Sequence, residues 1–184
     1  MRRHWLLVLF LFLGSFAALA TVMVQLSLDQ LTREADTVVL GHCTNKRVFK
    51  TGEMIYTEYT IQSYDVLKGS TAAEFKITQP GGALNGKGVY VSGVARFSPM
   101  EEVMLFLTKE KNGSRDIVGW SQGKLHVYYD AATGQKLAVQ QMGGAGMLNK
   151  TTGAITESHP AAVSLEQLRS QVKTIVAKQK DGKK

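Results

Sequence analysis

Histidine and cysteine are the residues of this sequence whose chemistry could support a metal site or a nucleophile. His42 and Cys43 are adjacent in one strand-like run, and His126 lies in a later run of the same kind. Neighbouring residues of a strand point to opposite faces, so His42 and Cys43 cannot bind one ion together. A zinc site needs three or four converging ligands. The pattern therefore predicts no metal site and no cofactor.

A nucleophilic thiol at Cys43 with His126 as its base is the one enzymatic arrangement that the sequence offers. Neither a helix N-terminus nor a cluster of cations is expected beside Cys43 to activate the thiol. No carboxylate pair stands out, and the glycine-rich stretch 81–88 lacks the Lys-Ser or Lys-Thr ending of a phosphate-binding loop. We expect no catalytic residues and no enzyme activity, and thiol chemistry at Cys43 is the third hypothesis for function.

Aromatic residues and glycines offer a binding surface instead. The strand-like runs of the sequence are expected to form a small antiparallel β-barrel. Loops at the mouth of such a barrel are where these folds usually bind their ligands. The candidate binding surface consists of Tyr56, Tyr64, Gly81, Gly82 and Tyr128. Packing in the core and at its rim is the competing interpretation of the aromatic residues. We favour packing for Trp120, because aromatic side chains are usually largely buried.

The first twenty residues are typical of a secretory signal peptide. A basic start at residues 1–4 precedes an apolar run over 5–13, and Ala18-Leu19-Ala20 forms a small-residue cleavage site. The apolar run is too short to span a membrane, which takes about 20 residues. We therefore predict cleavage after Ala20, export to the periplasm or the exterior, and no membrane span in the mature chain.

The charge of the chain is positive, at +7, and part of it lies in a lysine-rich end. We predict a basic disordered tail over residues 179–184. Attraction to anionic envelope polymers follows from the charge, whereas nucleic acid is not an expected partner of an exported protein. Cys43 is the single cysteine, so an intrachain disulfide is excluded and apolar burial must stabilise the fold.

Alternating apolar residues predict long antiparallel strands in the first half. Strands are expected over 37–49, 54–67 and 74–79, with a hairpin turn at Gly52, a bulge or bend at Gly41, and a flexible loop over 81–88. The odd positions of the second strand, from Ile55 to Leu67, are expected to share its inner face.

The second half predicts further strands and a helix at each end of the domain. The expected strands cover 89–94, the central 103–107, a hairpin of 116–121 with 124–129, and an edge strand over 136–140. Capping boxes at Ser27–Gln30 and Ser164–Gln167 predict a short helix over 28–35 and an amphipathic helix of about three turns after Ser164. The second helix is expected to dock on the barrel rather than lie on a membrane.

Several of these motifs, taken in order, resemble a netrin-like module. They are Ala35-Asp36, residues 56–61 leading to Leu67-Lys68-Gly69, residues 101–107, residues 123–127 and the helix start at Ser164. The pattern is also similar to a family of small exported bacterial proteins of unassigned function. The motifs shared with that family are Ala35-Asp36, Leu67-Lys68-Gly69, Gly81-Gly82 and Gln122-Gly123-Lys124. The resemblance covers most of residues 27–175.

The resemblance implies a mainly β fold, a small antiparallel OB-type barrel like that of the tissue inhibitors of metalloproteinases, as one domain over 21–178. Those inhibitors bind the zinc of the protease through an N-terminal cysteine, whereas this chain after Ala20 begins Thr21-Val22-Met23. Our leading hypothesis is an exported, non-enzymatic module that binds a protein or an envelope polymer. The alternative is an inhibitor of an extracellular metalloprotease that acts through the barrel rim or the Thr21 amine.

Overall fold

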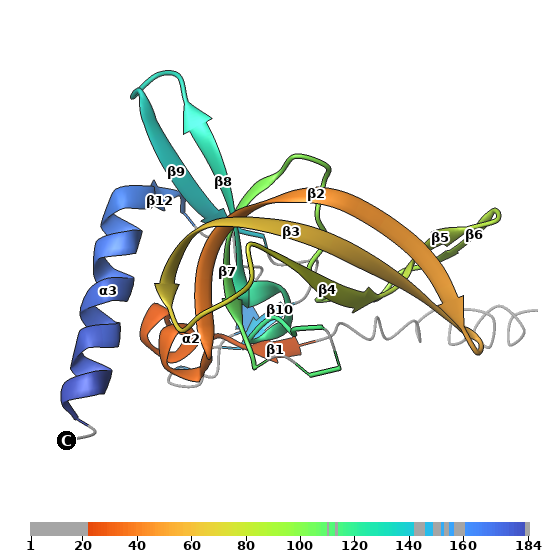
Figure 1. Ribbon diagram of the computed structural model, residues 1–184, viewed down its shortest axis with the longest axis horizontal. Coiled ribbons are helices and arrows are strands. Elements are labelled where there is room, and N and C mark those ends of the chain that lie inside the picture. The colour runs from red at the N-terminus through yellow and green to blue at the C-terminus, as the bar shows by residue number, and fades with distance from the viewer. Residues whose placement is uncertain are drawn as a thin grey trace, which may run out of the picture.

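A large antiparallel sheet with two helices on one of its faces makes up most of this computed structural model (Figure 1). The structure describes residues 22–109, 111–112, 114–141, 146–148, 152, 155–156 and 161–182. The proposed signal peptide lies outside the described residues. In the described part, no helix combines the length and the apolar character that a membrane crossing requires.

The chain forms twelve described strands, two α-helices and one short 3-10 helix. The strands are β1 (Val22–Val24), β2 (Thr37–Thr51), β3 (Met54–Lys68), β4 (Glu74–Pro80), β5 (Gly82–Leu84), β6 (Lys87–Val89), β7 (Glu102–Leu107), β8 (Lys124–Asp130), β9 (Gln135–Gln140), β10 (Gly146–Leu148), β11 (Ile155–Thr156) and β12 (Val163–Ser164). The helices are α2 (Leu28–Glu34), η1 (Trp120–Gly123) and α3 (Leu165–Asp181). The large sheet has the order β12-β9-β8-β7-β2-β3-β4, beside the small sheets β1-β10-β11 and β5-β6.

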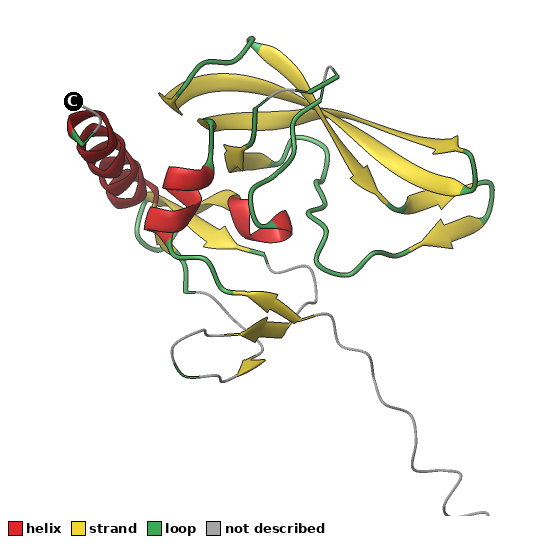
Figure 2. Cartoon of the chain, turned by 90° about the horizontal axis from the view of Figure 1, so that it is seen from below, coloured by secondary structure: helices red, strands yellow, loops and turns green. Residues whose placement is uncertain are grey.

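Strand β7 lies between β2 and β8, which confirms the prediction of a central strand there. Its successive side chains point to opposite faces, and each face has its own core. On the helix-covered face, Met104 and Phe106 pack with residues of α2 and α3. On the loop-covered face, Val103 and Leu105 pack with β3, β4 and the segment around Phe97. Figure 2 shows both helices beside the same part of the sheet.

The long hairpin of β2 and β3 turns at Gly52, as predicted, and contains three irregularities of register. Leu40 pairs with Asp65 and Gly41 with Ser63, so Tyr64 is an extra residue on β3 at the predicted Gly41 irregularity. Leu67 is a second extra residue on β3. Each extra residue reverses the alternation of side chains. The prediction that Leu67 shares the face of Ile61 is therefore wrong, because Leu67 packs in the helix-covered core.

The large sheet does not close into the expected cylinder, because β4 and β12 stand at its two ends. A loop covers the outer edge of β4 instead. Arg115 N–H donates to the Lys76 carbonyl (3.3 Å), and Ser114 Oγ accepts from Thr78 N–H (3.2 Å).

The predicted strand over 116–121 is wrong. Gly119 and Trp120 both have φ of 62°, a conformation that strands do not accommodate.

Three further predictions are corrected by local turn chemistry or by pairing. Residues 81–88 do not form the expected flexible loop but the β5–β6 hairpin, whose Asn85-Gly86 turn has φ of 51° and 75°. Asn-Gly favours the two-residue turn that needs positive φ at both positions. The expected strand over 89–94 reaches only Val89 of β6. Strand β9 is not an edge strand, because β12 pairs with it.

The two capping boxes have different outcomes. Ser27 and Gln30 form the predicted reciprocal bonds at the start of α2. The Ser164 side chain makes no capping bond, because Ser164 belongs to β12 and pairs with Leu137. Helix α3, expected to dock on a barrel, packs on the open sheet through Leu165, Leu168 and Val172. It continues to Asp181, so residues 179–181, expected in the disordered tail, are helical.

Candidate functional site

Two adjacent carboxylates at the start of β7 each gather a polar cluster, one on each face of the sheet. Glu101 lies on the loop-covered face, and its side chain contacts Lys124 and His126. Glu102 lies on the helix-covered face, and its side chain contacts Tyr64 and Lys136. Adjacent residues of an extended chain alternate in direction, so a Glu-Glu pair can place one carboxylate on each side.

The Glu101 cluster is buried and well hydrogen-bonded. Lys124 Nζ lies 2.6 Å from Glu101 Oε1, and these side chains are only 1% and 5% exposed. Glu101 Oε2 accepts from the Ser98 amide at 2.8 Å. Lys124 also donates to the carbonyl of Arg96 and to Gln141 Oε1, which satisfies its three N–H groups. Lys124 thereby attaches the loop 96–101 to β8.

Burial and charge act in opposite directions on the groups of this cluster. Burial lowers the pKa of Lys124 below its ordinary value, although the hydrogen bond and the charge of Glu101 counteract it. Cys43 lies behind the cluster, where its backbone pairs with Met100 and Glu101. Burial, with a contribution from the charge of Glu101, raises the pKa of the Cys43 thiol. Its side chain is buried and is not directly accessible to a substrate in this structure.

A hollow of about 430 Å³ opens above the Glu101 cluster. Its lining consists of Arg96, Phe97, Ser98, Pro99, Met100, Glu101, His126 and Gln141. The His126 ring is 31% exposed and directs Nδ1 to Glu101 Oε1 at 3.0 Å. Met100 at the rim is 71% exposed and has φ of 62°, which is unusual for a residue other than glycine. We call this site the His126 hollow.

Strand β8 and the loop before β7 position the groups of the His126 hollow. Lys124, His126 and Tyr128 alternate with core residues on β8 and therefore share the loop-covered face. The Tyr128 ring stacks on His126, with 5.8 Å between centroids. Arg96 extends from the loop, and its guanidinium lies 4.2 Å from the centroid of the Tyr90 ring. This distance is that of a cation–π contact, and Arg96 is exposed to solvent.

The Glu102 cluster on the opposite face is more exposed. Tyr64 donates to Glu102 Oε1 at 2.5 Å, and Lys136 Nζ lies 2.8 Å from both carboxylate oxygens. His42 Nε2 is 3.8 Å from Glu102 Oε2. Burial alone would raise the pKa of Glu102, but the hydrogen bonds of Lys136 and Tyr64 outweigh it and hold the pKa below its ordinary value. Burial and Glu102 together raise the pKa of Tyr64.

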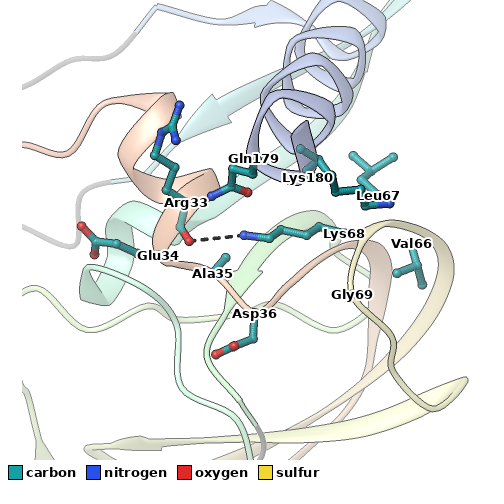
Figure 3. A pocket seen from close by; sticks show the side chains of 11 residues that line it. Arg33, Glu34, Ala35, Asp36, Val66, Leu67, Lys68, Gly69, Gln179 and Lys180 are labelled. Atoms are coloured by element: carbon teal, nitrogen blue, oxygen red, sulfur yellow. Dashed lines mark hydrogen bonds between the residues drawn. The ribbon is translucent and has the colours of Figure 1, made fainter. Parts of the chain in front are cut away.

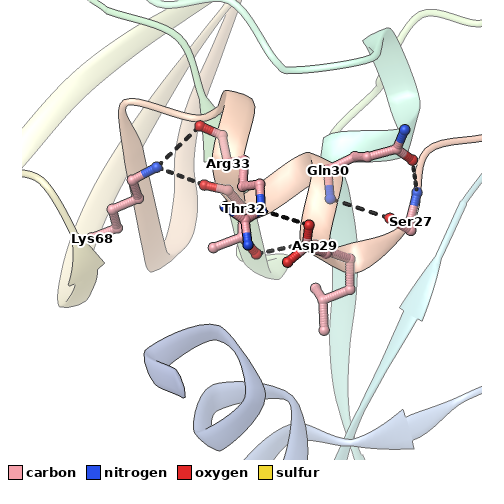
Figure 4. Close-up of polar contacts among 7 residues, drawn as sticks. Ser27, Asp29, Gln30, Thr32, Arg33 and Lys68 are labelled. Atoms are coloured by element: carbon pink, nitrogen blue, oxygen red, sulfur yellow. Dashed lines mark hydrogen bonds and ion pairs between the residues drawn. The ribbon is translucent and has the colours of Figure 1, made fainter. Parts of the chain in front are cut away.

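A second pocket, of about 570 Å³, lies between the end of α2, the end of β3 and the last turns of α3 (Figure 3). Lys68 on its wall donates to the carbonyls of Thr32 (2.6 Å) and Arg33 (3.3 Å) at the C-terminus of α2 (Figure 4). A cation at this end of a helix satisfies free carbonyls and interacts favourably with the helix dipole.

The motifs Ala35-Asp36 and Leu67-Lys68-Gly69 meet at this second pocket. Gly69 has φ of 70°, and a Cβ atom there would overlap the Asp36 carbonyl oxygen. Glycine is therefore required by backbone packing at this position. Lys68 caps the C-terminus of α2, and Gly69 packs against the Asp36 carbonyl. Both motifs, Ala35-Asp36 and Leu67-Lys68-Gly69, therefore have a structural role.

The structure separates the residues of the candidate binding surface. Tyr56 stacks on Phe49 with 5.9 Å between centroids, and Gly81 and Gly82 lie at the same end of the sheet, where the Gly81 amide donates to Ile55. Tyr64 is in the Glu102 cluster, and Tyr128 borders the His126 hollow on the other face. Trp120 is 54% exposed, so the packing interpretation for it is wrong.

Sequence reasoning missed Glu101 as the partner of His126 and Lys124 as the countercharge of Glu101. The available signals were the Glu-Glu pair before an apolar strand and the alternation of Lys124, His126 and Tyr128. Within the described residues, no three histidine, cysteine, aspartate or glutamate side chains form a group that could hold a metal ion. No protein-family model matches this chain, and no curated protein matches it.

Proposed function

We propose that this chain is an exported binding module of the OB type, similar to netrin-like modules, that binds its partner at the His126 hollow without catalysing a reaction. The order β4-β3-β2-β7-β8 within the large sheet supports the fold proposal. In this proposal β2, β3, β4, β7 and β8 are the five strands of an OB barrel, which is open between β4 and β8. OB folds are often partly open. The signal-peptide pattern of residues 1–20 supports export.

The binding proposal depends on one observation: an open hollow contains the partly exposed His126, and the buried Glu101, paired with Lys124, fixes the orientation of its ring. The ion pair of Lys124 and Glu101 orients His126 and fastens the loop that bears Met100. A binding site gains affinity when its polar groups are oriented before the ligand arrives. The exposed Met100 side chain at the rim adds an apolar contact that adapts to different partners.

Site-specific crosslinking in the cell envelope tests this proposal. A photoreactive phenylalanine derivative replaces Met100 in one protein and Glu53 in the control, whose side chain is 97% exposed at the β2–β3 turn. The proposal predicts a discrete adduct from position 100 and none from position 53. Equal adducts from both positions, or none from either, would contradict it. Whether the adduct contains a protease, another protein or a polymer separates inhibition from the other kinds of binding.

A further inference from the structure

The charged groups of the His126 hollow are predominantly cationic towards a ligand. Arg96 and Glu101 line the hollow, and the buried ammonium of Lys124, which does not line it, pairs with the Glu101 carboxylate, so that the positive charge of Arg96 is left uncompensated there. Both oxygens of that carboxylate already accept hydrogen bonds, from Lys124 and His126 at Oε1 and from the Ser98 amide at Oε2. The Arg96 side chain is exposed on the rim. An incoming group therefore meets the guanidinium and the imidazole rather than a free carboxylate.

The orientation of His126 determines what its second nitrogen can do. A carboxylate only accepts hydrogen bonds, so the contact of Nδ1 with Glu101 places a proton on Nδ1. Nε2 then carries a lone pair in the neutral ring and a proton in the charged ring. It makes no hydrogen bond with the part of the chain that the structure describes. Only the protonated ring can donate to an acidic group in the hollow.

We propose that the His126 hollow binds an acidic group, a carboxylate or a phosphate, between the Arg96 guanidinium and a protonated His126. This inference rests on the proposed function and names the ligand chemistry of the same site. The proton comes from solvent, and Glu101 stabilises the imidazolium from the other side of the ring. Binding of the acid and protonation of the imidazole therefore favour each other.

The other titratable groups around His126 have fixed partners. Lys124 donates hydrogen bonds to Glu101, Gln141 and a backbone carbonyl. Tyr128 stacks on the imidazole from the same strand, and Cys43 is buried behind Glu101. Strand β9 places Val139 opposite His126 and so adds no charge there. Among the described residues that line the hollow, Arg96 and His126 are therefore the groups that a ligand meets.

Nuclear magnetic resonance titration with acetate and with inorganic phosphate tests the proposal. Acetate stays ionised between about pH 6 and pH 8, so a change of its affinity over this range reports on the protein. We expect amide shifts at residues 96–101 and a weaker acetate affinity at the higher pH, because only the protonated ring donates a hydrogen bond from Nε2. His126→Gln should abolish this pH dependence, and Arg96→Gln should weaken acetate binding by about tenfold. The ratio of acetate to phosphate affinity shows which acidic group the hollow prefers.

Arg33→Gln on α2 is the matched control, because it removes an exposed arginine on the helix-covered side. This variant should bind acetate like the unaltered chain. The proposal is overturned if neither probe shifts residues 96–101, if all three variants bind alike, or if affinity does not fall with rising pH. Crosslinking from position 100 without anion binding would overturn the ligand chemistry alone, whereas the absence of both would overturn the proposed function as well.

Discussion

Glu101 and Glu102 are neighbours in the chain, yet their carboxylates serve clusters on opposite faces of the sheet. Glu101 forms an ion pair with the buried ammonium of Lys124. Glu102 accepts a hydrogen bond from the phenol of Tyr64 and forms an ion pair with the ammonium of Lys136. The Lys124–Glu101 pair is nearly inaccessible to water, whereas the Lys136–Glu102 pair is partly solvated. The two pairs should therefore respond differently to mutation and to pH.

Breaking the buried pair should be costly. Lys124→Met leaves the Glu101 carboxylate buried without its main countercharge, and we expect a loss of about 3 kcal/mol in the free energy of unfolding. The double variant Lys124→Met with Glu101→Gln should recover part of this loss, because no unpaired charge remains. Urea denaturation measures both. The exposed pair of Asp29 and Arg33 is the control, and Arg33→Gln should leave the denaturation midpoint nearly unchanged.

The Glu102 cluster should contribute to acid sensitivity. The folded-state pKa of Glu102 lies below its ordinary value of 4.5, so the folded state binds fewer protons than the unfolded state as the pH falls. Its stabilisation is present above the ordinary value and is lost as the pH falls through the depressed one. Glu102→Gln should therefore flatten the decline of stability between about pH 5 and pH 3. Glu53→Gln, at the exposed turn, should leave that decline as it is.

Two glycines with similar backbone angles should differ in tolerance. Gly69 and Gly86 have φ of 70° and 75°, but only at Gly69 does an added Cβ atom overlap another group, the Asp36 carbonyl. Gly86→Ala should lower the free energy of unfolding by about 1 kcal/mol through conformation alone. Gly69→Ala should lower the free energy of unfolding by about 3 kcal/mol, because the backbone at Asp36, between α2 and β2, must move as well. Equal costs in thermal denaturation would refute the packing role of Gly69.

The Cys43 thiol should be unreactive in the folded protein. It is buried, and its raised pKa reduces the thiolate fraction. At pH 8, reaction with a disulfide reagent should be about 100-fold slower than in the unfolded chain. In a Cys43→Ser background, Thr51→Cys at the exposed end of β2 should react at the unfolded rate. Rapid reaction of folded Cys43 would instead revive thiol chemistry as a function.

The sequence by itself determined the elements whose information is local. The alternation in 54–61, the apolar run of β7, the glycine turn at Gly52 and the Ser27 capping box each depend on residues a few positions apart. The failures at Trp120 and at Asn85-Gly86 were also local, because strand propensity was given more weight than turn geometry.

Only the tertiary structure decided which face Leu67 joins, whether the sheet closes, and which groups surround His126. An extra residue at Tyr64 and another at Leu67 depend on the pairing partner in β2, which no periodicity within β3 reveals. The Lys124–Glu101–His126 cluster joins β8 to the start of β7 across more than twenty residues of chain. Such a contact exists because the β7–β8 pairing and the loop over residues 96–101 bring these side chains into one buried space.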